Sequence, residues 1–285
     1  MSASFKGFQK EELLSIFKTM ATSRRTDEKM LTLLRQGKSF FHIGASGHEG
    51  AQLACAMQMN SKQDWSYPYY RDQTMVMGLG MTTEELFLGF LAKADDPGSG
   101  GRQLPQHYGQ KDLNIVSQSS PTGTQYLQAV GTAMATRQTD KNAIVYVSSG
   151  EGTTSQGEFH EALNWAGREK LPVLFHIEDN GFAISVPKSS QTAEGSVYDM
   201  VGGYGNLNRF ETDGTDFFDS FTTFKEAISS IRAGKGPAIV VSNVVRLLPH
   251  SSSDDHRKYR DADELSEEQK RDPIEKFRAQ CEKDG

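Results

Sequence analysis

Three short apolar runs, separated by stretches with helical periodicity, constrain the fold of this chain more than any other feature. Residues 143–147, 172–177 and 238–245 are rich in Val, Ile, Leu and Ala, and each is short enough to be one buried strand. Residues 155–169 and 217–233 lie between them and have the spacing of helices. Because buried strands that alternate with helices form parallel sheets, the sequence predicts an α/β fold: a doubly wound, mostly parallel sheet with helices on both faces.

Turn and capping signals mark where the helices begin. Ser155, with Glu158 three residues later, has the spacing of a capping box. Residues 213–216 predict a turn and a cap for the helix that follows. The Gly- and Pro-rich stretch 95–110 predicts a loop. Further helices are predicted at 10–36, 49–59, 83–91, 123–138 and 273–283.

Length and charge limit the domain organisation and the partners. The chain has 285 residues, which we interpret as a single domain over 1–285, with a charged loop and helix at 250–285. The formal net charge is −6 with no dominant basic patch, so nucleic acid is not an expected partner. No window of about 18 uncharged apolar residues predicts a membrane span.

The first residues and the cysteines bear on the compartment. The N-terminal segment resembles neither a secretory signal nor an Arg-rich transit peptide. Cys55 and Cys281 lie far apart and match no metal or redox spacing. We therefore expect a reduced, cytoplasmic bacterial protein; a processed mitochondrial matrix chain would have the same features and stays an alternative.

The strongest chemical signal lies at the end of the strand predicted at 143–147. Gly150-Glu151-Gly152 follows that strand, and Asn180 follows the next one, about thirty residues later. The carboxyl ends of parallel strands are where ligands bind in open α/β sheets. Glycines let the backbone approach a phosphate, and carboxylate and amide oxygens suit Mg²⁺. The alternative is a Gly-rich turn with an exposed Glu and an Asn in the next turn.

This pattern resembles a known signature. Gly-Asp/Glu-Gly followed by Asn is typical of thiamine-diphosphate enzymes, and the surrounding segments resemble the alpha subunit of the decarboxylating component of 2-oxo acid dehydrogenase complexes. The resemblance runs from about residue 10 to residue 275. The segments that carry it are Gly47-His48-Glu49-Gly50, Tyr70-Arg71-Asp72, Ser119-Ser120-Pro121, Gln128-Ala129-Val130-Gly131, Gly234-Lys235-Gly236-Pro237, Arg246 and His250-Ser251.

The resemblance implies a set of cofactor and metal contacts. Glu151, Asn180 and the carbonyl of Phe182 would hold Mg²⁺, with Gly150 and Gly152 beside the diphosphate. The remaining cofactor contacts that it implies are Tyr70, Arg71, Ser120, Thr122 and Arg246. Both arginines would pair with the diphosphate, because a guanidinium presents a planar fork of donors.

It also implies a catalytic histidine, a second cation and a pocket wall. His250 matches an active-site histidine that assists the substrate and the acyl transfer. Phe41 and Tyr70 are candidate walls of the substrate pocket. Ser119, Pro121, Thr124 and Gln125 match a segment that holds K⁺ in branched-chain members. Each has a plain alternative: Tyr70-Arg71 as a surface pair, Ser119–Pro121 as the start of a helix and His250 as a solvated loop residue.

Details of the sequence favour branched-chain 2-oxo acids as substrates. Glu151 stands where many thiamine enzymes have Asp, and the loop 250–255 resembles that of the branched-chain (2-oxoisovalerate) type. Two differences point the other way. Glu178 stands where some branched-chain enzymes carry an Arg near the phosphates, and Thr122 where they carry a Leu facing the cofactor.

The activity that the resemblance implies is oxidative decarboxylation of a 2-oxo acid with acyl transfer to a lipoyl group. The expected partners are a beta subunit, in a heterotetramer, and the lipoyl domain of the acyltransferase component. The glutamate that activates the cofactor lies on the beta subunit in this family, and no candidate for it stands in this sequence. The alternatives are the alpha subunit of a pyruvate or acetoin dehydrogenase and a non-catalytic assembly scaffold. At its end the chain is either a complete subunit, a truncated one or the front of an alpha–beta fusion.

Overall fold

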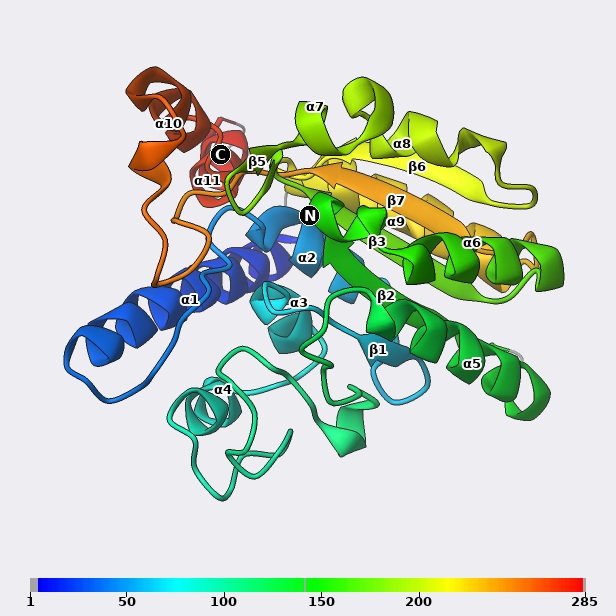
Figure 1. The fold of residues 1–285 in the computed structure, drawn as a ribbon, viewed down its shortest axis with the longest axis horizontal. Helices are drawn as coiled ribbons and strands as arrows, with labels where there is room; N and C mark the ends of the chain where they lie inside the picture. The colour runs from blue at the N-terminus through cyan, green and yellow to red at the C-terminus, as the bar shows by residue number, and fades with distance from the viewer. Residues whose placement is uncertain (1–4, 141, 284–285) are drawn as a thin grey trace.

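A five-stranded sheet in which all neighbouring strands are parallel forms the centre of the molecule (Figure 1). The computed structural model describes residues 5–140 and 142–283. The order of the strands is β1-β2-β3-β7-β6. Their bounds are β1 Trp65–Tyr67, β2 Val145–Gly150, β3 Val173–Asp179, β6 Asn208–Asp213 and β7 Ala238–Asn243. The α/β fold predicted from the apolar runs is thereby confirmed.

Helices cover both faces of this sheet. The described helices are α1 Lys10–Arg35, α2 Glu49–Ala56, α3 Gln73–Gly78, α4 Thr83–Phe90, α5 Thr124–Thr139, α6 Gly157–Glu169, α7 Lys188–Gln191, α8 Val197–Met200, α9 Phe217–Arg232, α10 Ala262–Gln269 and α11 Pro273–Glu282. A separate two-stranded hairpin consists of β4 Phe182–Ala183 and β5 Val186–Pro187. The five helices predicted at 10–36, 49–59, 83–91, 123–138 and 273–283 are all present, each with bounds within a few residues.

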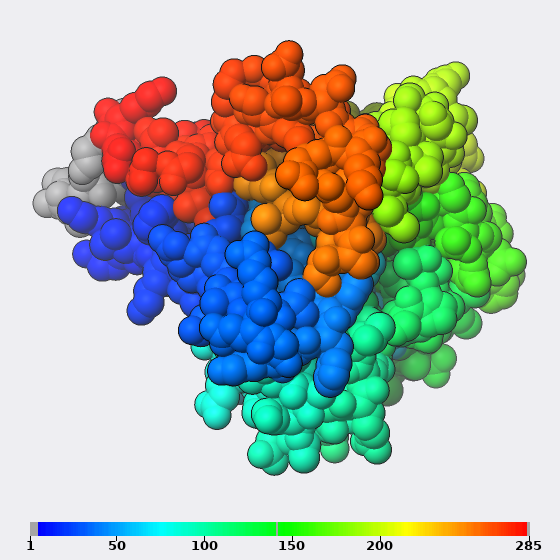
Figure 2. Space-filling view, turned by 60° about the vertical axis from the view of Figure 1, so that its left-hand side comes forward, coloured from blue at the N-terminus to red at the C-terminus, as the bar shows by residue number. Residues whose placement is uncertain are grey.

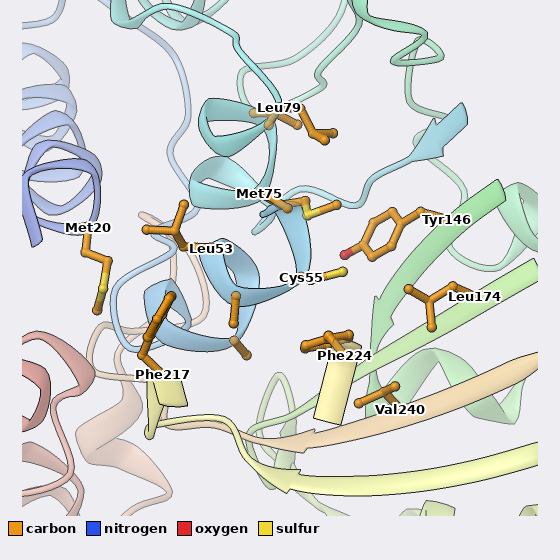
Figure 3. Close-up of a cluster of buried hydrophobic side chains, with 14 of the residues drawn as sticks. Met20, Leu53, Cys55, Met75, Leu79, Tyr146, Leu174, Phe217, Phe224 and Val240 are labelled. Atoms are coloured by element: carbon orange, nitrogen blue, oxygen red, sulfur yellow. The ribbon is translucent and has the colours of Figure 1, made fainter. Parts of the chain in front are cut away.

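The alternation of side chains along the strands divides the interior into two cores. In β3, Val173, Phe175 and Ile177 pack in a cluster with residues of α5 and α6. Leu174 points to the opposite face and packs with residues of α1, α2, α3 and α9. Figure 3 shows this second cluster, in which Leu174 lies near Phe224 of α9. Because successive side chains of a strand point to opposite faces, a strand buried on both sides is apolar throughout.

Two predicted helix caps have different outcomes. Asp216 caps α9 as expected, and its side chain accepts hydrogen bonds from the backbone N–H groups of Phe218 and Asp219. The capping box at Ser155 is wrong. Residues Glu151–Ser155 form a 3₁₀ turn, and α6 begins after Gln156 with no side-chain cap. The Ser155 hydroxyl is instead bonded to the side-chain amide of Gln191.

The C-terminal helix α11 packs on the rest of the domain. The Phe277 ring lies 5.4 Å from the Phe217 ring and 5.3 Å from the Phe218 ring, both on α9. Arg24 of α1 bonds to Asp272 at 2.7 Å, at the start of α11. In the described part of the chain, no helix is long and apolar enough to cross a membrane.

Candidate functional site

The carboxyl ends of β2 and β3 bring Glu151 and Asn180 together. The register of the two strands pairs Gly150 with Glu178, so the residues that follow each strand meet at one edge of the sheet. The Glu151 Oε2 atom accepts a hydrogen bond from the backbone N–H of Asn180 at 3.2 Å. The expectation that Glu151 faces Asn180 across neighbouring strand ends therefore agrees with the geometry.

Glu151 is a buried carboxyl group with one free oxygen. Its side chain is only 1 % exposed, and Oε1 has no hydrogen-bond partner among the described residues. Burial, and secondarily the charge of Asp179, raises the pKa of Glu151 to about 7. A buried oxygen without a partner is costly unless a donor or a cation satisfies it. The alternative of an exposed Glu in a turn is wrong, and the free oxygen fits a metal ligand.

A tight turn after β3 arranges the other two candidate Mg²⁺ ligands. The Asn180 Oδ1 atom accepts a hydrogen bond from the Phe182 backbone N–H at 3.3 Å. Gly181 has a φ of +83°, a conformation that favours glycine. The chain then enters the β4–β5 hairpin, which places Ala183 against Gly152: a Cβ atom on Gly152 would lie 2.6 Å from the Cβ of Ala183.

A cavity of about 260 Å³ opens at this edge of the sheet. Nine residues predicted from the sequence line it: Tyr70, Arg71, Thr122, Gly150, Glu151, Gly152, Asn180, Phe182 and His250. They come from loops that are far apart in the sequence and meet only in the fold. The wall also includes Tyr69, Thr153, Ala183 and Ile184, which are not predicted from the sequence.

Tyr70, Arg71 and His250 form one packed group in this wall. Arg71 is 1 % exposed, and its guanidinium carbon lies 5.3 Å from the centre of the Tyr70 ring. The rings of Tyr70 and His250 meet edge to face with centres 6.0 Å apart. Burial, and then the charges of Arg71 and Arg246, lowers the pKa of His250 to about 3. The alternatives of a surface Tyr-Arg pair and a solvated histidine are therefore wrong.

Arg246 follows the end of β7 and has hydrogen-bond donors without partners. It is 1 % exposed, and its Nη2 atom donates to the Ile184 carbonyl oxygen at 3.0 Å and to the Tyr259 hydroxyl at 2.8 Å. Its Nε and Nη1 atoms have no partner among the described residues. Since a guanidinium is always charged, these buried N–H groups fit an anion.

Ile184 and Tyr69 carry signals that are visible only in the structure. Ile184 has a φ of +58°, which is strained for a β-branched residue, and the hydrogen bond from Arg246 to its carbonyl oxygen holds it there. Its side chain is 55 % exposed although it lines the cavity. Tyr69 donates its hydroxyl hydrogen to Glu178 at 3.2 Å. Both residues stand next to predicted segments, but no sequence motif distinguishes them.

Glu178, the residue that departs from the branched-chain pattern, lies behind the cavity wall. Its carboxylate accepts hydrogen bonds from Gln52 at 2.9 Å and from Tyr69, and it also contacts the His48 Nδ1 atom. It is fully buried, and burial raises its pKa. The carboxylate is therefore held by protein donors and is not one of the groups that line the cavity.

Three predicted contact residues do not line the cavity: Arg246, Ser120 and Phe41. The Ser120 Oγ atom lies 2.6 Å from the His107 Nε2 atom, so its hydroxyl is engaged with a neighbouring loop. Phe41 is half-buried and is also outside the cavity wall. Figure 2 shows the segment around residues 250–260, in orange, against the blue segment that follows α1. The two segments are joined by Ser252 and His42, whose backbone groups bond at 2.8 Å.

The residues expected to hold K⁺ lie together at the start of α5. The Thr124 Oγ1 atom lies 2.7 Å from the Ser119 Oγ atom and 3.0 Å from the Pro121 carbonyl oxygen. The Gln125 amide donates to the Ser148 carbonyl at 3.1 Å. Hydroxyl and carbonyl oxygens of this kind suit a hard cation. A cluster of three or more His, Cys, Asp or Glu side chains that could hold a metal is not found within residues 5–140 and 142–283.

The fold and this cavity define a cofactor-binding α/β protein in which carboxylate, amide and guanidinium groups converge at the ends of parallel strands. The chain belongs to the family described as "Dehydrogenase E1 component", whose sequence profile matches residues 17–285. Membership implies an oxidoreductase that decarboxylates 2-oxo acids, depends on thiamine diphosphate and works with a beta subunit.

Known relatives match nearly the whole chain. The 2-oxoisovalerate dehydrogenase subunit alpha of Bacillus subtilis (strain 168) is 41 % identical over 279 residues, which are 98 % of this chain and 84 % of that protein. The pyruvate dehydrogenase E1 component subunit alpha of Staphylococcus aureus (strain Mu50 / ATCC 700699) is 33 % identical over 96 % of this chain and 71 % of its own length. The mitochondrial 2-oxoisovalerate dehydrogenase subunit alpha of Caenorhabditis elegans is 35 % identical over 95 % of this chain and 62 % of its own length.

Proposed function

We propose that this chain is the alpha subunit of a branched-chain 2-oxo acid dehydrogenase, with 2-oxoisovalerate (3-methyl-2-oxobutanoate) as a substrate. The 41 % identity to a 2-oxoisovalerate dehydrogenase alpha subunit supports this substrate over pyruvate, for which the relative is 33 % identical. The observation that carries the chemistry is the buried pair of Glu151 and Asn180 with a free carboxylate oxygen. The acyl product would pass to a lipoyl group on the acyltransferase component.

The residues in the cavity wall, with Arg246 outside it, fit a magnesium diphosphate. Glu151 Oε1 is a buried acceptor without a partner, whereas Arg246 Nε and Nη1 are buried donors without one. The free carboxylate oxygen suits a cation, and the free guanidinium N–H groups suit phosphate oxygens. Because Gly150 and Gly152 have no side chains, their backbone is open to the cavity. We therefore assign Mg²⁺ to Glu151, Asn180 and the Phe182 carbonyl, and the diphosphate to Arg246, Arg71, Tyr70 and Thr122.

The chemistry that thiamine diphosphate supplies when bound is stabilisation of the carbanion left by decarboxylation. The residues of this chain bind and orient it. The buried ring of Tyr69, the half-buried ring of Tyr70 and the hairpin at Ile184 reduce the access of water to the cavity, which strengthens electrostatic contacts inside it. His250 is the candidate catalytic residue, because it lines the same cavity and stays neutral at physiological pH.

A K⁺ ion beside the cavity is a further proposal. Ser119, Pro121, Thr124 and Gln125 lie at the start of α5, on both sides of Thr122 of the cavity wall in the sequence. A cation there would fix the turn that carries Thr122. Cofactor affinity measured in KCl and in tetramethylammonium chloride at equal ionic strength checks this, and equal affinities in both salts would exclude a role for K⁺.

The substrate is tested with the assembled enzyme. The chain is co-expressed with its beta subunit, and decarboxylation of 3-methyl-2-oxobutanoate is compared with that of pyruvate. A higher kcat/KM for the branched substrate is expected, and a preference for pyruvate would move the chain to the pyruvate or acetoin class. The isolated chain is expected to be inactive because the activating glutamate lies on the beta subunit, so robust decarboxylation without it would contradict the assignment.

The scaffold alternative makes a different prediction for the same complex. Glu151, Asn180, Arg71, Arg246 and His250 are all intact, and four of them line one cavity. A scaffold would have no reason to keep a buried carboxylate oxygen unpaired. Calorimetric titration of the complex with thiamine diphosphate and Mg²⁺ discriminates the two, since the absence of binding would favour the scaffold. Acyl transfer is tested separately with a free lipoyl domain as acceptor.

A further inference from the structure

The short helix α7 lies beside the two turns that carry the candidate metal ligands. It follows the β4–β5 hairpin directly in the chain (Figure 1). Its first residue, Lys188, bonds to the turn after β3, and its last residue, Gln191, bonds to the turn after β2. The helix therefore connects the two segments whose residues we assign to Mg²⁺.

Lys188 holds the turn after β3 through both its side chain and its backbone. The Nζ atom lies 2.6 Å from the Asp179 Oδ2 atom, and the backbone N–H donates to the Gly181 carbonyl oxygen at 2.8 Å. The Asp179 Oδ1 atom accepts a hydrogen bond from the Gly181 N–H at 3.0 Å. The Asp179 side chain is only 3 % exposed, so solvent screens this ion pair less than a surface pair. Asn180 thus lies between two anchored residues.

Gln191 holds the turn after β2 through its side-chain amide nitrogen. The Nε2 atom donates to the Ser155 hydroxyl oxygen at 2.5 Å and to the carbonyl oxygens of Gly152 and Glu151 at 3.3 and 3.4 Å. These acceptors all belong to the 3₁₀ turn Glu151–Ser155. The amide therefore fixes the backbone from which the Glu151 side chain extends.

The two turns also touch each other directly. The Glu151 Oε2 atom accepts the Asn180 backbone N–H at 3.2 Å. A Cβ atom on Gly152 would lie 2.6 Å from the Cβ of Ala183, so the turn after β2 and the hairpin are in close contact. With α7 bonded to both turns, protein contacts fix the position of Glu151 relative to Asn180 and Phe182.

We propose that α7 is a clamp on the metal site: Lys188 and Gln191 are positioning residues that hold the ligands of the two turns in a fixed arrangement, so that the site prefers Mg²⁺ to Ca²⁺. Mg²⁺ requires near-ideal octahedral geometry with oxygens at about 2.0–2.1 Å, whereas Ca²⁺ accepts about 2.3–2.6 Å and more flexible arrangements. A site that cannot widen therefore favours the smaller ion. The inference rests on the proposed function, because it takes the cation to be the one that accompanies the diphosphate.

The charge of Lys188 acts in the same direction. Asp179 lies close enough to Glu151 for its charge to act on that carboxyl group, and Lys188 opposes the effect. Ca²⁺ takes more oxygen ligands than Mg²⁺, and a released Asp179 carboxylate would be an additional oxygen ligand next to Asn180. Lys188 and Gly181 engage both oxygens of Asp179, which keeps this carboxylate from binding an ion.

The clamp is tested through the ion that supports cofactor binding. Thiamine diphosphate is titrated calorimetrically into the complex of this chain with its beta subunit, once with Mg²⁺ and once with Ca²⁺. In Gln191→Ala and in Lys188→Met, the affinity with Mg²⁺ should fall about 10–100-fold, as for other residues that orient metal ligands. The affinity with Ca²⁺ should fall less, because Ca²⁺ tolerates a widened site. The preference for Mg²⁺ should therefore shrink in both variants.

Two further variants are matched controls on the same helix. Lys188→Arg keeps the positive charge and should keep the wild-type preference for Mg²⁺. Ser190→Ala changes an exposed residue of α7 and should leave both affinities unchanged. An unchanged ratio of the two affinities in Gln191→Ala and Lys188→Met would overturn the proposal, whether both affinities fall together or neither falls.

Hydrogen exchange provides a readout that requires neither cofactor nor activity. In the complex without cofactor, the backbone amides of Asn180 and Phe182 should exchange faster in Gln191→Ala and Lys188→Met than in the wild type, while the amides of β3 keep their slow exchange. Unchanged exchange at Asn180 and Phe182 would contradict the clamp.

The wild-type complex separates the clamp from the proposed function. If it binds thiamine diphosphate with neither ion, the result counts against the proposed function. If it binds the cofactor equally well with Mg²⁺ and Ca²⁺, the result counts against the clamp alone.

Discussion

The Glu151 side chain accepts a hydrogen bond from the backbone N–H of Asn180 at 3.2 Å and keeps its second oxygen unpaired. The contact exists because β2 and β3 are adjacent and parallel, with Gly150 opposite Glu178. One carboxylate oxygen thus fixes the turn after β3, and the other is free for the metal ion that we propose. The same residue links the architecture of the sheet to the chemistry of the cavity.

Gly152→Ala should disturb the site by crowding. A Cβ atom on Gly152 would lie 2.6 Å from the Cβ of Ala183, so the β4–β5 hairpin would have to move. We expect a loss of about 1–3 kcal/mol in the free energy of unfolding, as for other overpacked positions, together with weaker Mg²⁺-dependent cofactor binding. Urea unfolding and calorimetry measure the two effects. Gly157→Ala, where an added Cβ meets nothing within 4 Å, is the control and should change neither.

Asp27→Ala should loosen the loop that carries Gly44. The buried Asp27 carboxylate accepts hydrogen bonds from the Ala45 N–H at 2.7 Å and from both the N–H and the hydroxyl of Ser46, at 3.1 and 3.0 Å. Removing the acceptor leaves these donors unpaired, at a cost of about 3 kcal/mol of unfolding free energy. Glu28→Ala removes an exposed carboxylate one residue away and should cost less than about 1 kcal/mol. Equal losses in the two variants would mean that the loop is held by other contacts.

The pH dependence of stability should reveal the buried His176. Burial, and then the charge of His48, lowers its pKa to about 3 in the folded chain, against 6.5 as the ordinary value. Between these values the unfolded chain binds the proton and the folded chain does not. The contribution of His176 is therefore complete above pH 6.5 and is lost as the pH falls toward 3, by up to about 1.4 kcal/mol per pH unit.

His176→Gln tests this by removing the titrating group. Urea unfolding at several pH values should give a shallower fall in stability below pH 6.5 than in the wild type. Tyr146→Phe removes the hydroxyl that lies 3.0 Å from His176 Nδ1 and leaves the imidazole, so it should keep the wild-type slope. The interpretation would be abandoned if the slope of His176→Gln matched that of the wild type.

The central strands and the pair of Glu151 and Asn180 could be predicted because their signals are local. β2, β3 and β7 are buried on both faces, and each therefore begins with a short apolar run. The two edge strands have no such signal. β6 reads Asn-Arg-Phe-Glu-Thr-Asp and is mostly half-buried, and β1 has three residues. Both were missed, since a polar or very short strand is defined by its neighbour in the sheet.

Side-chain partners decide the remaining differences at the site. Ser155 fits a capping box by spacing, but Gln191, 36 residues away, takes its hydroxyl. Ser120 fits a cofactor contact by resemblance, but its hydroxyl lies against His107. Ile184 lines the cavity because a strained turn is held by Arg246, from a distant strand end. Such contacts between distant segments depend on the packed fold and leave no pattern in the sequence.

The most direct test of the account is the metal dependence of cofactor binding by the complex of this chain with its beta subunit. Calorimetric titration with thiamine diphosphate should show tight binding with Mg²⁺ and little without it. Glu151→Gln keeps the size of the side chain but not the charge, and it should weaken the binding on the order of 100-fold. Tight binding without a divalent cation, or an unchanged affinity in Glu151→Gln, would contradict the assignment of the free carboxylate oxygen to Mg²⁺.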